Sequence, residues 1–160
     1  MVMDATKEPI KNKKSPARLL FGIALLLFGA YVLYGGITGL ADNKSRLTAS
    51  KGTLTIETVD SDSSRAQGLS GRSSIGDNEG MLFIFDETVD TNCFWMKDMQ
   101  FSIDMVWLNE KKEVVTVIPE VAPETFPESF CPTQPAKYGL EIAASRAEEL
   151  EIKLGQELRF

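Results

Sequence analysis

The chain has 160 residues and an acidic balance, with 23 aspartates and glutamates against 17 lysines and arginines and a formal net charge of -6. This length suits one ordinary domain with a short additional segment, and the acidic part from residue 42 onward repels phosphate backbones, so nucleic acid is not expected as a partner. The chain contains no histidine, which excludes Ser-His-Asp and Cys-His catalysis and removes the commonest ligand of zinc, copper and iron.

The N-terminal part reads as a polar tail followed by an apolar segment. Residues 1–18 are rich in lysine and predict a disordered cytoplasmic tail. Residues 19–41 carry no charge, and as a helix they span roughly 35 Å, enough to cross a hydrocarbon core of about 30 Å. The basic cluster before this segment predicts a single-pass membrane anchor with everything after residue 41 outside the cell. A cleaved signal peptide followed by secretion is the alternative, although signal h-regions usually run about 7–15 residues.

From residue 42 onward the chain reads as a polar linker over residues 42–52 and a β-rich domain over residues 53–160. Apolar residues that alternate with polar ones, or form short runs between turn residues, predict its strands. The expected strands cover residues 53–59, 80–85, 93–97, 103–108, 113–118, 138–142 and 154–160. Short helices are expected over residues 65–69 and 144–150, and residues 119–135 hold five prolines and predict an irregular loop. This content indicates an all-β, mainly antiparallel sandwich or partly open barrel.

Cys93 and Cys131 are the only cysteines. Because the predicted topology places both outside the cytoplasm, we expect a disulfide between them. Its loop closure would stabilise the fold by about 4 kcal/mol. Free thiols, or a redox or nucleophilic cysteine, are the alternatives, and the second of these lacks both a C-x-x-C motif and a histidine base.

Several spaced motifs run through the last two thirds of the chain. They are Arg65-x-x-Gly-Leu69 with Arg72, Glu79-Gly-Met-Leu-Phe83, Phe94-Trp-Met-Lys97, Ile103-Asp104 followed by Trp107, Tyr138-x-Leu-Glu141, and a final Gly-x-x-Leu-x-Phe. In this order and spacing, residues 53–160 resemble the domain-of-unknown-function family 192, an uncharacterised protein family. The resemblance implies a small β-rich sandwich of jelly-roll type, often behind a signal or membrane anchor, and it implies no reaction. Two departures lie near the C-terminus, where Ala144 or Ser145 replaces a usual turn glycine and Gly-Gln replaces a usual Gly-Asp.

A few polar residues stand inside the apolar run from Gly80 to Trp107, where Met81, Phe83 and Phe85 are interpreted as core. Asp104 occupies a position where an apolar residue is expected, and a buried carboxylate must be paired or hydrogen-bonded. The candidate partners are Arg65, Arg72 and Lys97. The structural interpretation is an ion pair of Asp104 with Arg65 or Lys97. The functional interpretation makes Trp95 an apolar platform beside Lys97 and Arg65 for an anionic or hydroxyl-rich ligand.

Glu141 is a second carboxylate in an apolar setting. Asp104 and Glu141 could form an acid/base pair for glycoside cleavage, which needs two carboxyls about 5–10 Å apart. Asp104, Glu141 and Glu79 offer only oxygen ligands to a divalent metal, without the loop spacing of a known site, so we predict neither a metal nor a cofactor.

The sequence therefore predicts a membrane-anchored, extracytoplasmic binding module for an envelope glycan or a cell-surface protein. The expected ligand-binding residues are Arg65, Trp95, Lys97, Asp104 and Glu141. One alternative is a hydrolase that acts on envelope saccharides through Asp104 and Glu141, which leaves enzymatic activity open. The other is a structural or assembly protein without a small ligand. No oligomeric state is predicted.

Overall fold

The structure is a computed structural model that describes residues 44–160. The predicted cytoplasmic tail, the predicted membrane anchor and its signal-peptide alternative lie outside the described residues. Within residues 44–160, no helix combines the length and the apolar character that a membrane span requires.

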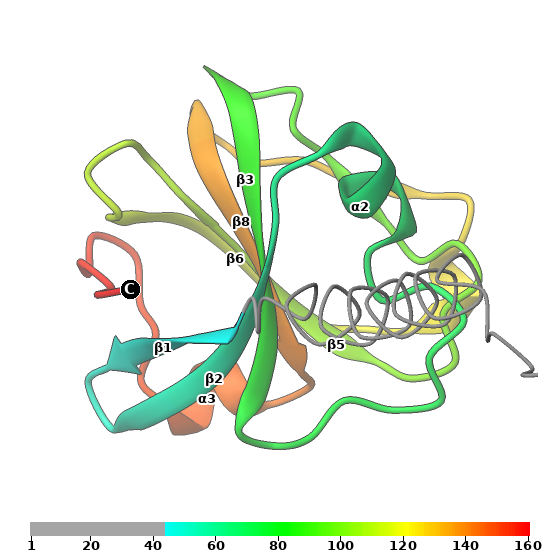
Figure 1. The fold of residues 1–160 in the computed structure, drawn as a ribbon, viewed down its shortest axis with the longest axis horizontal. Coiled ribbons are helices and arrows are strands. Elements are labelled where there is room, and N and C mark those ends of the chain that lie inside the picture. Colours follow the sequence, from blue (N-terminus) through cyan, green and yellow to red (C-terminus); the bar gives the residue numbers. More distant parts are fainter. Residues whose placement is uncertain (1–43) are drawn as a thin grey trace, which may run out of the picture. The chain divides into compact units, whose positions relative to one another are not determined.

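One six-stranded sheet forms the centre of the domain, with the strand order β1-β2-β3-β8-β5-β6 (Figure 1). Its strands are β1 (Lys44–Ala49), β2 (Gly52–Val59), β3 (Glu79–Val89), β5 (Ile103–Leu108), β6 (Val114–Val121) and β8 (Ala136–Ala143). All neighbours pair antiparallel except β2 and β3, which are parallel. A separate pair joins β4 (Phe94–Trp95) to β7 (Ser129–Phe130). The helices are α2 (Asp62–Gln67), the 3-10 turn η1 (Pro123–Thr125) and α3 (Arg146–Glu149).

The prediction of a mainly β domain with two short helices is confirmed. The strands do not close into a barrel, and they form one large sheet with a two-stranded accessory in place of two large facing sheets. The predicted linker contains β1, a polar edge strand in which Leu47 is the one buried residue. Residues 154–160 are not a strand. They join the sheet through the isolated bridges Thr48–Arg159 and Glu113–Glu157, through backbone hydrogen bonds such as the one from Val114 N–H to the Gln156 carbonyl oxygen, and through the buried Leu158 side chain.

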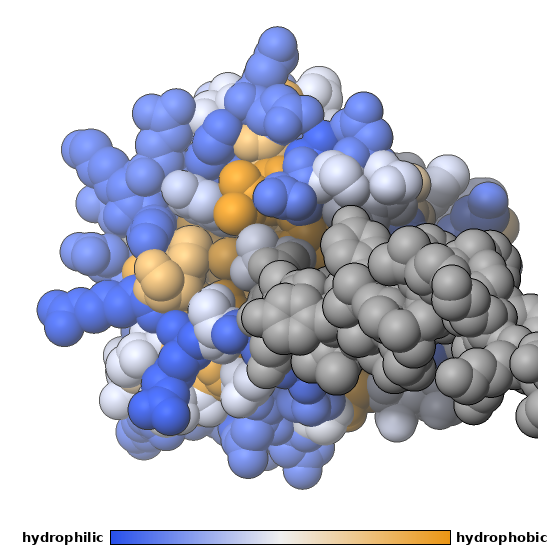
Figure 2. Space-filling view, viewed as in Figure 1, coloured by the Kyte–Doolittle hydropathy of each residue, from blue (hydrophilic) through white to orange (hydrophobic). Residues whose placement is uncertain are grey.

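Both faces of the sheet are buried, because the central strands alternate between two apolar sets. We call one the α2 face; its buried residues include Met81, Phe83, Met105 and Trp107. The other is the α3 face; its buried residues include Leu82, Val106, Leu140 and Ile142. Figure 1 shows α2 and α3 on opposite sides of the sheet. Hydrophilic side chains dominate the surface in Figure 2, with apolar ones showing between them.

A disulfide between Cys93 and Cys131 confirms the predicted pairing. It adjoins the β4–β7 pair, in which Phe94 lies opposite Phe130 and Trp95 opposite Ser129. The disulfide and these strands therefore tie the proline-containing loop to the segment that covers the α2 face of the sheet.

Candidate functional site

A pocket of about 370 Å³ opens on the α2 face of the sheet. It is bounded by α2 and the turn after it, by β3 and β8, and by the segment around β4. The lining residues are Arg65, Ala66, Gln67, Gly68, Leu69, Ser70, Phe83, Phe85, Thr91, Asn92, Cys93, Phe94, Trp95, Met99 and Glu141. Four of these residues are aromatic, and the lining includes one arginine and one carboxyl group.

Phe94 forms a wall of the pocket because Gly139 leaves room for its ring. Gly139 precedes Glu141 by two positions on β8, so both lie on the α2 face. The Phe94 ring stacks on Trp107 with centroids 5.0 Å apart and lies 4.7 Å from the Phe83 ring. A Cβ atom added at Gly139 would lie 2.3 Å from Cζ of Phe94. The aromatic wall therefore requires glycine at this position.

The Gly139→Ala variant is expected to lose about 1–3 kcal/mol of unfolding free energy, because its methyl group overpacks this contact. Chemical denaturation with matched m-values would measure the loss. Gly76→Ala is the control, since an added Cβ there meets only the flexible Glu79 side chain, at 3.1 Å or more. Equal stabilities of the two variants would show that Phe94 is not fixed against β8.

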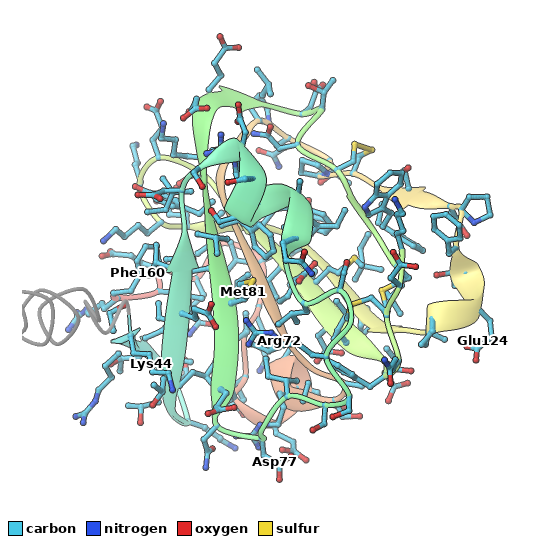
Figure 3. The ribbon with its side chains drawn as sticks, turned by 45° about the vertical axis from the view of Figure 1, so that its right-hand side comes forward. Lys44, Arg72, Asp77, Met81, Glu124 and Phe160 are labelled. Atoms are coloured by element: carbon cyan, nitrogen blue, oxygen red, sulfur yellow. A yellow bond between two sulfur atoms is a disulfide. The ribbon has the colours of Figure 1, made fainter. Side chains whose placement is uncertain are left out.

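Glu141 is the buried carboxyl group of the pocket. It is 5 % exposed and lies on β8 between its cross-strand neighbours Met81 (labelled on β3 in Figure 3) and Met105. No side chain or backbone group of residues 44–160 forms a hydrogen bond or ion pair with the Glu141 side chain. Burial raises the pKa of Glu141 to about 8. The carboxyl group is therefore mostly protonated at pH 7.

Arg65 lines the same pocket, but both of its terminal nitrogens are already engaged. Its Nη1 donates to the carbonyl oxygens of Asp60, at 2.6 Å, and Ile84, at 2.8 Å. Its Nη2 pairs with Asp62 at 2.5 Å and with Asp86 at 2.7 Å. Desolvation alone would lower the pKa of Arg65, but the hydrogen bonds and charges of the two aspartates outweigh it and raise the pKa. Arg65 therefore ties α2 to the end of β2 and to the middle of β3.

Trp95 is the exposed aromatic residue of the pocket, with 51 % of its surface accessible. Its ring makes an edge contact with Phe126, with centroids 6.0 Å apart. Lys97 Nζ lies 5.7 Å from the centroid of the Trp95 ring, although Lys97 does not line the pocket. Of the predicted binding residues, Arg65, Trp95 and Glu141 thus gather at one pocket, and Lys97 touches it through Trp95.

Asp104 lies elsewhere, and the prediction that it pairs with Arg65 or Lys97 is wrong. Its side chain is fully buried on the α3 face and accepts three backbone N–H bonds, from Glu120 at 2.8 Å, Ser145 at 3.1 Å and Ala147 at 2.7 Å. Backbone donors satisfy this carboxylate without a cation. The third candidate partner, Arg72, pairs with Glu57 at 2.8 Å.

The two carboxylates of the hydrolase hypothesis lie on opposite faces of the sheet. Asp104 is the cross-strand neighbour of Ile142, not of Glu141, so Asp104 points to the α3 face and Glu141 to the α2 face. They cannot act together on one glycosidic bond. The same placement separates Asp104 from the metal set proposed with Glu141 and Glu79, and residues 44–160 contain no cluster of three such side chains.

Most of the aromatic lining was not predicted as part of a site. Phe83 and Phe85 read as core, and both also line the pocket. Alternation along a regular strand would put Phe94 and Trp95 on opposite faces, yet both residues line the pocket, and β4 is only two residues long. The phenylalanines carry no residue-level signal for a pocket, because core and pocket use the same apolar side chains.

Comparisons with known proteins give a family and a fold. The model of the family DUF192, described as "Uncharacterized ACR", matches residues 45–160. A solved structure from Sinorhizobium meliloti 1021, described as a "putative transcription regulator", is 29 % identical with a TM-score of 0.65, covering 71 % of this chain and 89 % of that one. A protein of unknown function from Novosphingobium aromaticivorans DSM 12444 is 24 % identical with a TM-score of 0.63, over 73 % and 84 % of the two chains. The second likeness shows the fold alone. No curated protein matches the chain.

Proposed function

The chain belongs to the DUF192 family, and we propose that this member is a binding module that takes an envelope saccharide into the pocket on its α2 face. The domain would stand outside the cell behind the anchor predicted at residues 19–41. The disulfide between Cys93 and Cys131 supports that location, because such bonds persist in oxidising compartments.

The pocket carries the proposal. Its volume of about 370 Å³ lies at the small end of ligand sites, which span about 300–1,000 Å³. Trp95 and Phe85 offer flat apolar surfaces on which the C–H face of a sugar ring can stack. The amide nitrogen of Asn92 donates to the carbonyls of Glu87 and Ala136, so its amide oxygen can accept from a sugar hydroxyl. Apolar walls with a few fixed polar groups suit a small hydroxyl-rich ligand.

Binding is favoured over hydrolysis because the pocket contains one carboxyl group where glycoside cleavage needs two. Glu141 supplies that group, while Asp104 accepts hydrogen bonds from backbone N–H groups on the opposite face of the sheet. A cell-surface protein is the second candidate partner. The observation that favours it is the exposed aromatic pair of Trp95 and Phe126, which are 51 % and 44 % accessible.

A thermal-shift and calorimetry screen of the full chain in detergent against envelope saccharides tests the proposal. A ligand at 100 times its dissociation constant stabilises the protein by about 2.7 kcal/mol, a shift of several degrees. Trp95→Ala is expected to weaken binding at least tenfold, whereas Phe126→Ala, an exposed aromatic outside the pocket lining, keeps it. The proposal fails if no saccharide shifts the transition or if both variants bind like the parent. Loss of a protein partner in both variants would instead support the second candidate.

A further inference from the structure

We propose that the ligand carries an amine or ammonium cation and that the Glu141 carboxylate is its counter-ion. This inference rests on the proposed function and names the charged group that the pocket recognises. It adds a positively charged group to the hydroxyl-rich ligand of the proposed function.

The first argument is the lack of a partner for Glu141. Its cross-strand neighbours Met81 and Met105 offer thioether sulfur and methyl groups, neither of which donates a hydrogen bond. Within residues 44–160 the side chain has no hydrogen bond or ion pair. A carboxyl group that is 5 % exposed and borders a cavity leaves its partner to be supplied by the occupant of that cavity.

The second argument is that, among residues 44–160, the pocket lining contains one basic side chain, Arg65, which already has other partners. Arg65 already binds two carbonyls and two carboxylates. Lys97 Nζ lies 5.7 Å from the centroid of the Trp95 ring, and Lys97 does not line the pocket. An anionic ligand would therefore meet an engaged arginine and an unpaired carboxyl group, whereas a cation would meet a free acceptor.

The third argument is the aromatic lining. Phe94 lies 4.7 Å from Phe83 and 6.0 Å from Phe85, measured between ring centroids, and all three line the pocket with Trp95. The negative faces of aromatic rings attract cations, most strongly where water is excluded. The acidic domain as a whole also raises the local concentration of cations. Ring faces and a carboxylate in one pocket are the two groups that bind amines best.

Proton release gives this pairing a measurable signature. Burial raises the pKa of Glu141 to about 8, so a cation that binds the ionised form must displace a proton at lower pH. Affinity for a permanent cation should then rise about tenfold per pH unit below that pKa and less steeply near it. Other charged groups near the pocket come from α2, β3, β8 and the β4 segment. They are Arg65 with its partners Asp62 and Asp86, Lys137, whose Nζ donates to the carbonyl oxygen of Asp86, Glu79 at the start of β3, and Lys97.

Two matched pairs of probes test the inference by calorimetry on the full chain in detergent. The first pair is choline and its neutral carbon analogue, in which carbon replaces the nitrogen atom. The second pair is glucosamine and glucose. We expect the cation of at least one pair to bind at least tenfold tighter than its neutral partner at pH 7. A preference within the choline pair would indicate an ammonium headgroup as the source of the cation. A preference within the glucosamine pair would indicate an amino sugar.

The pH dependence and one variant assign the preference to Glu141. Choline binding should strengthen about tenfold between pH 6 and pH 7 with release of close to one proton, and less steeply as the pH approaches 8. Buffers of different ionisation enthalpy report the proton release. Glu141→Gln should remove both the cation preference and the proton release. Because proton release is read on the parent chain, the test does not depend on that variant alone.

Two different failures are distinguishable. If glucose and glucosamine bind equally and both depend on Trp95, the saccharide site stands and the cation inference is wrong. If none of the four probes and no envelope saccharide binds, the proposed function is wrong as well. A cation preference that Glu141→Gln retains would also overturn the role assigned to this carboxylate.

Discussion

Replacing Asp104 by alanine is expected to lower the free energy of unfolding by about 3–5 kcal/mol, because each buried N–H left without an acceptor costs about 1–3 kcal/mol. The carboxylate holds the backbone N–H groups of Glu120, Ser145 and Ala147. These residues belong to the end of β6 and the start of α3. The substitution should destabilise the end of β6 and the start of α3 together, because the Asp104 side chain bonds to both.

Chemical denaturation of three variants would measure this effect. Asp104→Asn keeps one oxygen but turns an NH2 group toward backbone donors, so an intermediate loss is expected. Asp77→Ala is the control, because Asp77 is exposed on a loop, and it should change stability by less than about 0.5 kcal/mol. A loss below about 1 kcal/mol for Asp104→Ala would mean that water replaces the carboxylate at all three N–H groups.

The Glu141→Gln variant is expected to be more stable than the parent above pH 8, by up to about 5 kcal/mol. Burial raises the pKa of Glu141 from 4.5 to about 8. Between these two pH values the folded parent keeps a proton that the unfolded chain has lost, so the parent loses stability as the pH rises. Below pH 4 both states hold the proton, and the parent and the variant should be equally stable.

The measurement is the stability difference between parent and variant from pH 4 to pH 9. Taking a difference cancels the titration of other carboxylates, including those that favour folding at higher pH. Glu128→Gln is the matched control, because Glu128 is exposed, and its difference from the parent should stay flat. A flat curve for Glu141→Gln would show that the Glu141 carboxyl group ionises in the folded state as easily as in the unfolded chain.

The strands that the sequence predicted best are those with the strongest burial. The expected bounds of β5 agree with the structure, and all six of its residues are buried. β1 was assigned to a linker because an edge strand contributes little burial to its own pattern, with Leu47 alone fully covered. The parallel pairing of β2 with β3 also could not be read from the pattern, since alternation reports which face a residue takes and not which strand lies beside it.

The polar residues of the site also divide into features that the sequence could predict and features that it could not. Arg65, Trp95 and Glu141 could be singled out because each is unusual for its surroundings, and all three line the pocket. Asp104 was singled out for the same reason, but its partners are backbone N–H groups as far as 43 positions away. The pattern of side chains in a sequence does not show which backbone N–H groups will donate to a buried carboxylate. The contact of Phe94 with Gly139 is likewise a tertiary one, and a glycine in a strand predicts a close approach without saying of what.

The place of β8 in the sheet has a consequence for how the protein is made. β8 lies between β3 and β5 and is the only strand that joins β1-β2-β3 to β5-β6. It is also the last strand of the described chain to leave the ribosome. Until residues 136–143 emerge, a nascent chain holds two partial sheets, each with a bare hydrogen-bonding edge that can pair with another polypeptide. A chaperone that shields these edges during synthesis would protect this protein more than one whose last strand forms the rim of its sheet.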